Sequence, residues 1–589
     1  MTVVRVQPDV PAIHRAFDYS LPSRLLDRFA GAVRVGTVVR VPLHGRRVRG
    51  WVLDADVAEP EATELRDVLA VVGAGPPPEI VDLCCWAAWR WAGPRASFLR
   101  AASAPNVVAA GAVEVEQAVY PGAPLHGEQL TLIGPRAAVE VPIAPEGSTL
   151  VIDPSAARAA QLASHLERQG REVVTLGSEH ADAVRTAHWD RSRAGACVVV
   201  GGRAAVWAPV PDLCAVVVVD EGDEALEDER APTWNARDVA VERARRAGAA
   251  VRVLTPAATV DVLVAVGEPV GGAGGWPPVE VVDQRDEEPG HGVLSAALAD
   301  ALRHAVGRGE RAVCVLNRRG RARLLACRTC RELARCERCG ATVEQRDDGF
   351  VCAHCGTTRP SVCLHCHGST FRAVRPGITR VRDDLAALLP RVEVASVDAS
   401  TDAVPDVPVL VGTEAVLHRL VGHAGVGASP PTGRRTGLVA YLELDQELLA
   451  PRARAAEQAL WLLVRGARLL DDRGRLLLQT RLPDHEVVRA ARRGDAMIVA
   501  RAERTRRAAL GFPPFGGLAE VSGAPEAVEA ACAAVVAAGA TVLGPVADGS
   551  RALVRAPSVA AVCDALAAPA VEAARTRGRL RIDVDPRRV

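Results

Sequence analysis

Lysine is absent from the 589-residue sequence, so all 71 of its Lys and Arg residues are arginines. This absence excludes any site that depends on a flexible ammonium group, including the lysine of a Walker A loop that reaches the phosphates of ATP. Net charge is lacking too, because acidic residues also number 71. No global field would draw such a chain onto nucleic acid or a membrane, so we expect any charged binding surface to be local.

Signals for export or membrane insertion are also missing. The N-terminal stretch MTVVRVQPDVPAIHRAFDY has no basic segment followed by an apolar core, so we expect no signal peptide. The uncharged run 530–547 is rich in Ala and Gly and contains Pro545, which favours a core helix leading into a strand. We therefore expect a cytoplasmic, nucleoid-associated protein without a membrane partner, whose 15 cysteines bind metal or stay buried rather than form disulfides.

The composition and periodicity predict a multidomain α/β protein. Hydrophobic residues make up 49% of the chain, and its length allows three to five domains. Val-rich runs alternate with amphipathic helical patterns in two successive units, which predicts two parallel sheets covered by helices. The expected divisions are a β-rich domain at 1–105, a linker at 106–147, a first lobe at 148–285, a second lobe at 286–326 and 367–481, a Cys-rich insert at 327–366, and a small α+β domain at 482–589.

Helix signals are clear in the first lobe. Leu162 and Leu166 lie one turn apart, and Gly170 is a C-terminal stop signal. A second helix is predicted over NARDVAVERARRAG, ending at Gly248 before the strand AVRVLTP.

Eight cysteines fall within the 40 residues 327–366 as four CxxC pairs. This spacing lets both thiolates of a pair reach one ion, and two pairs complete a tetrahedral zinc site. Because thiolates would fill every coordination position, we expect two structural zinc ions rather than a catalytic one. The four pairs are Cys327 and Cys330, Cys336 and Cys339, Cys352 and Cys355, and Cys363 and Cys366.

Which cysteine pairs share an ion is open from the spacing alone. A nested arrangement joins the first pair to the fourth and the second to the third, whereas a sequential arrangement joins neighbours along the chain. His354, His365 and His367 are alternative ligands that we expect to be bystanders. Eleven arginines against four acids between Arg308 and Arg346 favour this region for contact with phosphate, although a solvated charged face is the alternative.

An apolar run ends in acids at VVVVDEGDE, residues 216–224. In a nucleotriphosphatase, an acid pair at a strand end holds magnesium and water, and Asp220 and Glu221 are placed for that role. No GxxxxGK[ST] loop precedes them. We therefore predict that ATP and Mg²⁺ are not used and that Asp220 and Glu221 are vestigial. The sheet would then be that of an NTPase that has lost its activity.

Several motifs together resemble the primosomal protein N′ (PriA) family of bacterial replication-restart proteins. AFDYSLP with VRVGTVVRVPL resembles the family's domain for DNA 3′ ends, and VVVVDEGDE with WNARDVAVERA resembles its first helicase lobe. VLNRRG before the cysteines, and LGFPPF, VLGP and IDVDP near the end, resemble its later parts. The resemblance implies a β-rich DNA-binding domain, two RecA-like lobes, a two-zinc insert with nested sets of cysteines, and an α+β C-terminal domain.

Three parts of the family's ATPase are altered together. The DEEH box is replaced by DEGD at 220–223, SATP by PAAT at 256–259, and the QxxGRxGR arginine motif by a stretch containing only Arg465 and Arg468. The region 106–147 leaves little room for the family's winged helix and Walker A loop. The chain thus resembles a helicase-degenerate branch of the kind found in GC-rich, actinobacterial-type bacteria.

The resemblance also implies DNA-binding residues and partners. Phe17 and Asp18 match the pair that holds the terminal nucleotide, and Arg66 matches a basic residue later in that domain. The expected function is to bind stalled forks, 3′ ends and single-strand/duplex junctions. Expected protein partners are the primosome, the proteins that load the replicative helicase, and single-stranded DNA-binding protein. The alternatives are an active ATP-dependent 3′→5′ helicase using Asp220 and Glu221, and a zinc-ribbon protein of transcription or RNA metabolism.

Overall fold

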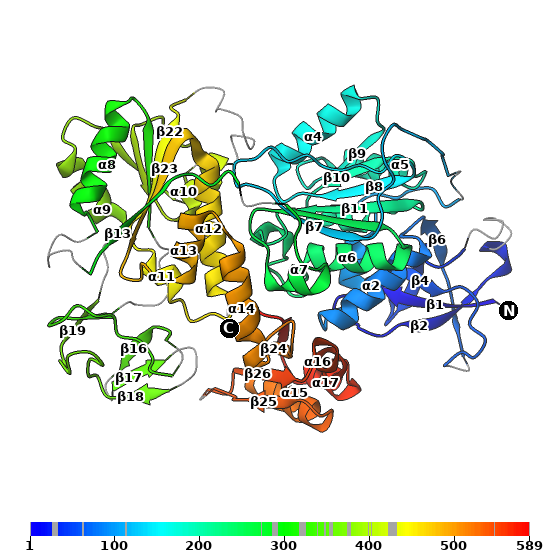
Figure 1. Cartoon of the computed structure of the whole chain (residues 1–589). Helices are drawn as coiled ribbons and strands as arrows, with labels where there is room; N and C mark the ends of the chain where they lie inside the picture. The colour runs from blue at the N-terminus through cyan, green and yellow to red at the C-terminus, as the bar shows by residue number, and fades with distance from the viewer. Residues whose placement is uncertain are drawn as a thin grey trace.

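The computed structural model describes residues 2–25, 33–61, 64–111, 113, 115–271, 274–285, 293–316, 325–338, 340–346, 349–352, 357–373, 378–398, 400–401, 403–421, 433–546 and 548–587. Two α/β lobes lie side by side, with the N-terminal β-rich domain beyond the first lobe (Figure 1). The Cys-rich insert lies below the second lobe, and the C-terminal domain lies below the junction of the two lobes.

The N-terminal domain is a six-stranded sheet in the order β5-β2-β1-β4-β3-β6, followed by two helices. Trp51 of β4 is fully buried and packs with the helices. This burial joins the sheet to the two helices that follow it. The elements are β1 (Thr2–Pro8), β2 (Phe17–Leu21), β3 (Val38–Leu43), β4 (Arg46–Asp54), β5 (Arg66–Asp67), β6 (Ala70–Gly73), α2 (Pro78–Arg90) and α3 (Arg95–Ala101).

The first lobe is a parallel sheet in the order β7-β12-β11-β8-β10-β9 with helices on its faces. The last five residues of β11 are buried, as expected for a strand covered on both sides. The elements are β7 (Glu128–Leu132), β8 (Ser148–Ile152), α4 (Ala156–Arg168), β9 (Val173–Leu176), α5 (Asp182–Ser192), β10 (Val198–Gly201), η1 (Arg203–Trp207), β11 (Leu213–Val219), η2 (Glu224–Leu226), α6 (Ala236–Ala247), β12 (Ala250–Thr255) and α7 (Val260–Ala265).

Both helices that were predicted in the first lobe are confirmed. Ser155 caps α4 by accepting a hydrogen bond from the Arg158 amide, and Gly170 beyond its end has φ +77°. Asn235 caps α6, and Gly248 terminates it in the left-handed conformation at φ 65°.

The stretch predicted as a linker, 106–147, contributes a strand. Within it, β7 pairs in parallel with β12 and forms one edge of the first-lobe sheet. As an edge strand, β7 has only two buried residues among five instead of a continuous apolar run, so its pattern resembles that of a polar segment. The exact domain boundaries otherwise remain predictions.

The second lobe is another parallel sheet, in the order β13-β23-β22-β14-β21-β20. Helix α12 packs into the core of this lobe, and α13 does the same although it lies in the segment assigned from sequence to the C-terminal domain. The elements are β13 (Val279–Asp283), α8 (Ala296–Gly307), β14 (Arg311–Val315), α9 (Ile378–Leu388), β20 (Val394–Val397), β21 (Val409–Gly412), α10 (Glu414–Val421), β22 (Thr436–Tyr441), α11 (Asp445–Leu448), α12 (Ala455–Leu469), β23 (Leu470–Thr480) and α13 (Glu486–Arg493).

The Cys-rich insert holds two small sheets, β15-β19 and β16-β17-β18. Its elements are β15 (Leu325–Cys327), β16 (Val343–Arg346), β17 (Gly349–Cys352), β18 (Thr358–Arg359) and β19 (Phe371–Ala373).

The C-terminal domain is an antiparallel sheet in the order β25-β26-β24-β27, reached from the second lobe through α14 (Figure 1). Among the described residues, no helix has the length and apolar character needed to cross a bilayer. The elements are α14 (Met497–Leu510), β24 (Gly517–Gly523), α15 (Pro525–Ala537), β25 (Thr541–Leu543), β26 (Arg551–Ala556), α16 (Val559–Leu566), α17 (Pro569–Ala574), η3 (Arg575–Arg577) and β27 (Leu580–Val584).

Candidate functional site

The acids predicted at the end of the Val run lie at the edge of the first-lobe sheet. All strands of this sheet are parallel, so their carboxyl ends meet at one edge, where doubly wound sheets bind ligands. Asp153 follows β8, and Asp220 and Glu221 follow β11. All three are at most 1% exposed, and Asp220 is in the left-handed conformation at φ 54°.

Both oxygens of the Asp220 carboxylate are engaged by arginines. Arg158 of α4 donates from Nη2 to Oδ2 at 2.6 Å, and Arg468 of α12 donates from Nη2 to Oδ1 at 2.6 Å. Arg158 also donates to both oxygens of Asp153, at 2.5 and 2.6 Å. Burial alone would raise the pKa of the Asp220 carboxyl, but the guanidinium groups of Arg468 and Arg158 outweigh it and hold that pKa below its ordinary value.

Glu221 is likewise bound within the protein. Its Oε1 accepts a hydrogen bond from the Thr259 amide at 2.7 Å. Its Oε2 accepts from the Thr259 hydroxyl at 2.9 Å and from Nη1 of Arg237 at 3.1 Å. The acid pair that holds magnesium in a motor ATPase therefore has its oxygens committed to side chains of the same chain.

The second lobe closes over this edge. The side chain of Trp461 packs against Gly222, where a Cβ atom would lie 2.2 Å from the indole nitrogen. Arg465 donates to Asp223 at 3.5 Å and also to Glu414. Among the described residues, one cavity at this junction, lined by Gly222, Thr259, Trp461 and Arg465, is about 30 Å³, which is enough for one or two water molecules and far too small for a nucleoside triphosphate.

No connection in the described part of this sheet has the form of a phosphate-binding loop, which needs a glycine-rich turn that ends in lysine and opens a helix. After β7 the chain runs from residue 133 to β8 without a helix, and there Arg136 donates to the carbonyls of Gly275 and Asp471. Between β8 and α4 lie only Asp153, Pro154 and Ser155. The residues present therefore do not fit ATP and Mg²⁺.

Sequence reasoning placed Asp220 and Glu221 correctly but missed the cations that engage them. Arg158 belongs to no motif, and nothing in the sequence distinguishes it among 71 arginines. Arg237 lies in the WNARDVAVERA segment, but its contact with Glu221 was not predicted. Arg465 and Arg468 are the two arginines of the stretch that replaces the family's arginine motif, and both reach acids of the first lobe.

A four-cysteine cluster able to hold a metal ion is present in the Cys-rich insert. The sulfurs of Cys327, Cys330, Cys363 and Cys366 all lie within 4.8 Å of one another. The contacts Cys327–Cys366 and Cys330–Cys363 are both 3.5 Å, close to the roughly 3.8 Å between sulfurs in a tetrahedral Zn–S site with bonds of about 2.3 Å.

The ends of the insert bring this cluster together. Strands β15 and β19 pair antiparallel, with Cys327 opposite Phe371, so the first and last CxxC segments meet. Burial raises the pKa of the Cys327 thiol, but hydrogen bonds from the backbone amides of Cys330 and Thr329 outweigh it and lower that pKa to about 6. The donor set and its amide hydrogen bonds suit a bound thiophilic cation.

The inner cysteines are only partly described. Cys336 and Cys352 are buried in a small core with Phe350, which packs edge-on against Phe371 at 4.7 Å. Their predicted partners Cys339 and Cys355, and also His354, lie outside the described residues. His365 and His367 are exposed and do not belong to the four-cysteine cluster.

The predicted 3′-end residues lie on β2 and β5. Asp18 is paired in register with Arg5 across the sheet and accepts two hydrogen bonds from it, at 2.8 and 3.0 Å. It also accepts the Glu61 amide at 2.8 Å, and its side chain is 1% exposed. Three of its roughly four acceptor positions are thus occupied within the protein.

Phe17 and Arg66 are more accessible. Phe17 is half-buried and is covered by the guanidinium of Arg15, 4.6 Å from its ring centre. It points to the opposite face of β2 from Asp18, because neighbouring strand residues alternate. Arg66 is exposed on β5, in register with Tyr19.

The basic region predicted around the cysteines is partly neutralised. Arg308 pairs with Glu310, and Arg311 with Asp406. Two further ion pairs in this region are Arg335–Glu332 and Arg346–Glu344. Four of its eleven arginines, at 318, 319, 321 and 323, lie outside the described residues.

Two family models match the chain. The one described as "3′DNA-binding domain (3′BD)" of PriA covers residues 5–104, and the one described as "Primosomal protein N C-terminal domain" covers 508–587. The first spans the predicted DNA-binding domain, and the second spans the end of α14 and the antiparallel sheet.

Several proteins of similar sequence are named replication restart protein PriA. The "Probable replication restart protein PriA" of Mycobacterium leprae is 30% identical over 88% of this chain and 87% of its own, and that of Mycobacterium tuberculosis is 29% identical over 87% and 85%. The "Replication restart protein PriA" of Treponema pallidum is 30% identical over 64% of this chain, which spans 62% of that relative's length.

Among solved structures, RecG bound to a three-way DNA junction is 12% identical with a TM-score of 0.31, covering 60% of this chain and 39% of that one. Such a weak likeness carries no argument. The family is shown instead by the relatives that align over most of the chain and by the two matched domains. The chain belongs to the PriA family of replication restart proteins.

Proposed function

We propose that this protein binds stalled or branched DNA forks and starts primosome assembly, so that the replicative helicase is reloaded, without acting as a helicase itself. The observation that carries the proposal is the internal occupation of the acid pair. Arg158 and Arg468 take both oxygens of Asp220, and Arg237 and Thr259 take those of Glu221.

The two lobes then serve as architecture. A motor couples ATP binding to closure of its lobes and hydrolysis to their opening, which requires a nucleotide between them. Here the lobes contact each other directly: Arg454 donates to Asp261 at 2.6 and 3.0 Å, and Glu457 accepts from the Val260 amide at 2.9 Å. Such contacts support a fixed spacing of the DNA-binding parts.

DNA recognition is assigned to the N-terminal domain and the Cys-rich insert. Stacking of a terminal base on Phe17 suits its half-buried ring, and Arg66 can contact phosphate. For Asp18 to accept a terminal 3′-hydroxyl, the free acceptor position on its carboxylate must become accessible, or Arg5 must release an oxygen. Two zinc ions, one held by the described four-cysteine cluster and one by Cys336, Cys339, Cys352 and Cys355, would stabilise the insert.

The protein partners are proposed from family membership. They are primosome proteins, the loader of the replicative helicase, and single-stranded DNA-binding protein. No contact in the described structure identifies the surface that each would use.

The decisive experiment measures ATP hydrolysis and fork binding on the same preparation. We expect no hydrolysis above background with forked DNA, and tighter binding to a fork with a free 3′ leading-strand end than to linear duplex. DNA-stimulated turnover that disappears in Asp220→Asn would instead establish an active helicase. Equal binding to fork and linear duplex would favour a zinc-ribbon protein of another pathway.

A further inference from the structure

The helices α13 and α14, which link the second lobe to the C-terminal domain, carry exposed arginines on their outer sides. Arg489, Arg492 and Arg493 are three and four residues apart on α13, so they lie on one face of the helix. The opposite face of α13 is aliphatic and buried in the core of the second lobe. On α14, Arg501 is exposed one turn before Arg504.

Among the described residues, no ion pair joins Arg489, Arg492, Arg493 or Arg501 to an acid. Two of the nearby acids are held by other arginines. Glu486 of α13 pairs with Arg506 at 2.7 Å, and Glu503 of α14 is bound by Arg506 and Arg507. Asp495, between the helices, accepts from the Met497 amide at 3.0 Å.

Acids on the neighbouring elements are also neutralised. Glu280 of β13, which packs against α13, pairs with Arg475 at 3.3 Å. Glu268, just beyond α7, pairs with Arg504 at 2.9 Å. We call Arg489, Arg492, Arg493 and Arg501 the outer arginines. Among the described residues they form no ion pair, although the chain is neutral overall.

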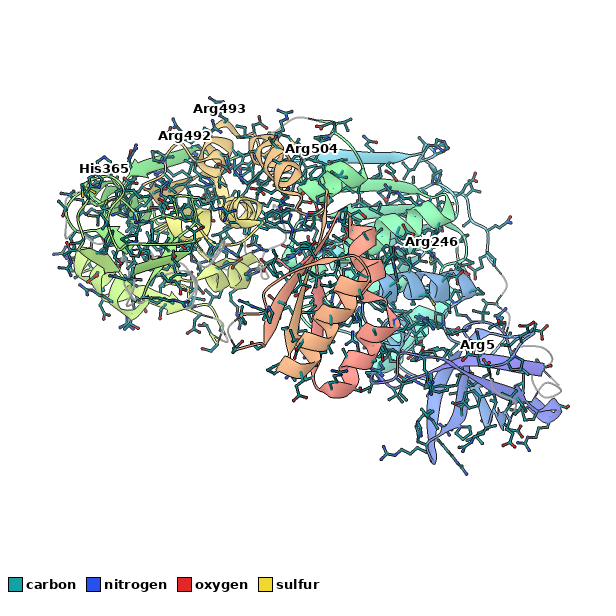
Figure 2. All side chains as sticks on the ribbon, turned by 90° about the horizontal axis from the view of Figure 1, so that it is seen from below. Arg5, Arg246, His365, Arg492, Arg493 and Arg504 are labelled. Carbon is teal, nitrogen blue, oxygen red and sulfur yellow. The ribbon has the colours of Figure 1, made fainter. Side chains whose placement is uncertain are left out.

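The outer arginines occupy an accessible margin of the molecule. Figure 2 shows Arg492 and Arg493 side by side at this margin, with Arg504 farther along it. The dipole of α13 favours cations in its last turn, which accounts for Arg492 and Arg493 but not for Arg489 or Arg501. Like charges at helical spacing destabilise a helix slightly, so this arrangement calls for an anionic partner that spans two helices.

We propose that the outer arginines form a second DNA-contacting surface, which binds the sugar–phosphate backbone of a double-stranded arm of the fork. Rigid helices with guanidinium groups one turn apart suit a row of phosphates, and they read no sequence. The inference rests on the proposed fork binding and extends it to a surface that belongs to neither the N-terminal domain nor the Cys-rich insert.

The test compares full-length variants on a fork with long duplex arms. Arg489→Gln, Arg492→Gln and Arg493→Gln are combined in one variant. A matched control replaces by glutamine three exposed arginines that lie in separate parts of the chain and form no ion pair among the described residues, Arg168, Arg391 and Arg577. A third variant places lysine at all three α13 positions, which keeps the charge.

The measurement is the dependence of the dissociation constant on salt. Each phosphate contact contributes about 0.9 to the slope of log K against log salt, so the glutamine variant should lose roughly 2.7 from that slope. The ratio of the glutamine variant's dissociation constant to that of wild type should then fall about 40-fold between about 50 and 200 mM salt. The lysine variant and the control should keep the wild-type slope.

The outcomes separate the two ideas. If wild-type protein shows no preference for forks, the proposed function fails. If wild type binds forks and the glutamine variant keeps the full slope, the second DNA surface is refuted. An equal loss of slope in the control also refutes it, because the effect would then follow total charge. A melting temperature shared by all variants excludes unfolding as the cause of any difference.

Discussion

Replacing Asp220 by asparagine separates a structural carboxylate from a catalytic one. Asparagine keeps the shape of the side chain and tolerates the left-handed backbone at φ 54°. It removes the negative charge that faces Arg158 and Arg468, both 2.6 Å away. In a motor ATPase this change abolishes hydrolysis and has little reason to destabilise the fold.

The expected cost in stability follows from the partners that remain. Arg158 keeps its two bonds to Asp153, whereas Arg468 keeps only the Pro135 carbonyl at 3.3 Å as a hydrogen-bond acceptor. Leaving a buried charge without its partner costs about 3–5 kcal/mol, and the retained amide oxygen favours the lower end. For a lobe of this size, a loss of about 3 kcal/mol lowers the melting temperature by roughly 6–12 °C.

Calorimetry of the full chain measures this shift, and hydrogen exchange of peptides from β8 and α4 locates it in the first lobe. Asp190→Asn is the matched control, because its ion pair with Arg193 is half-exposed and should change stability by less than about 0.5 kcal/mol. Combining Asp220→Asn with Arg468→Met removes the unpaired charge and should restore most of the lost stability. The reasoning is refuted if Asp220→Asn melts at or above the wild-type temperature.

Three further predictions concern the metal, the 3′ end and acid. Unfolding in a chelator should release two zinc ions per chain, which a metal-sensitive dye would count. Cys330→Ser should lower the number released by one and make residues 327–366 accessible to protease, which mass spectrometry would detect. A variant that still releases two zinc ions contradicts the assignment of Cys330 as a ligand. Phe17→Ala should weaken binding to a fork with a free 3′ end by about 5- to 150-fold, corresponding to about 1–3 kcal/mol of stacking, with binding to blunt duplex unchanged in the same competition assay. Arg5 lowers the pKa of Asp18 by hydrogen bonding, so this carboxylate stabilises the fold above the ordinary pKa of an aspartate, and the effect is lost as pH falls through the depressed value. The gap in melting temperature between wild type and Asp18→Asn should therefore stay constant from about pH 7 to about pH 4 and close below it; a gap that persists in stronger acid would assign the effect to packing.

The parallel sheets could be predicted because their strands are buried on both faces. The end of β11 is a run of four valines, and such a short, continuous β-branched run is typical of a strand covered on both sides. The edge strand β7 gave no such signal, since only two of its five residues are buried. Its place in the sheet depends on pairing with β12, more than 100 residues later in the chain.

The candidate site was predictable on its acidic side only. Asp220 and Glu221 follow directly from the end of a strand, but their partners come from elsewhere in the fold. Arg158 lies 62 residues away from Asp220 in sequence, and Arg468 lies 248 residues away. The ion pair between Arg5 and Asp18 was hidden for a similar reason, because it requires the register between β1 and β2.

The arginine-filled junction between the lobes also bears on how the protein leaves DNA. Under the proposed function, the junction uses no cycle of ATP binding and hydrolysis from which directional stepping could draw work. Departure from a fork would then be governed by spontaneous dissociation and by competition from incoming proteins. Its residence time should be the same in starved and well-fed cells, whatever their ratio of ATP to ADP.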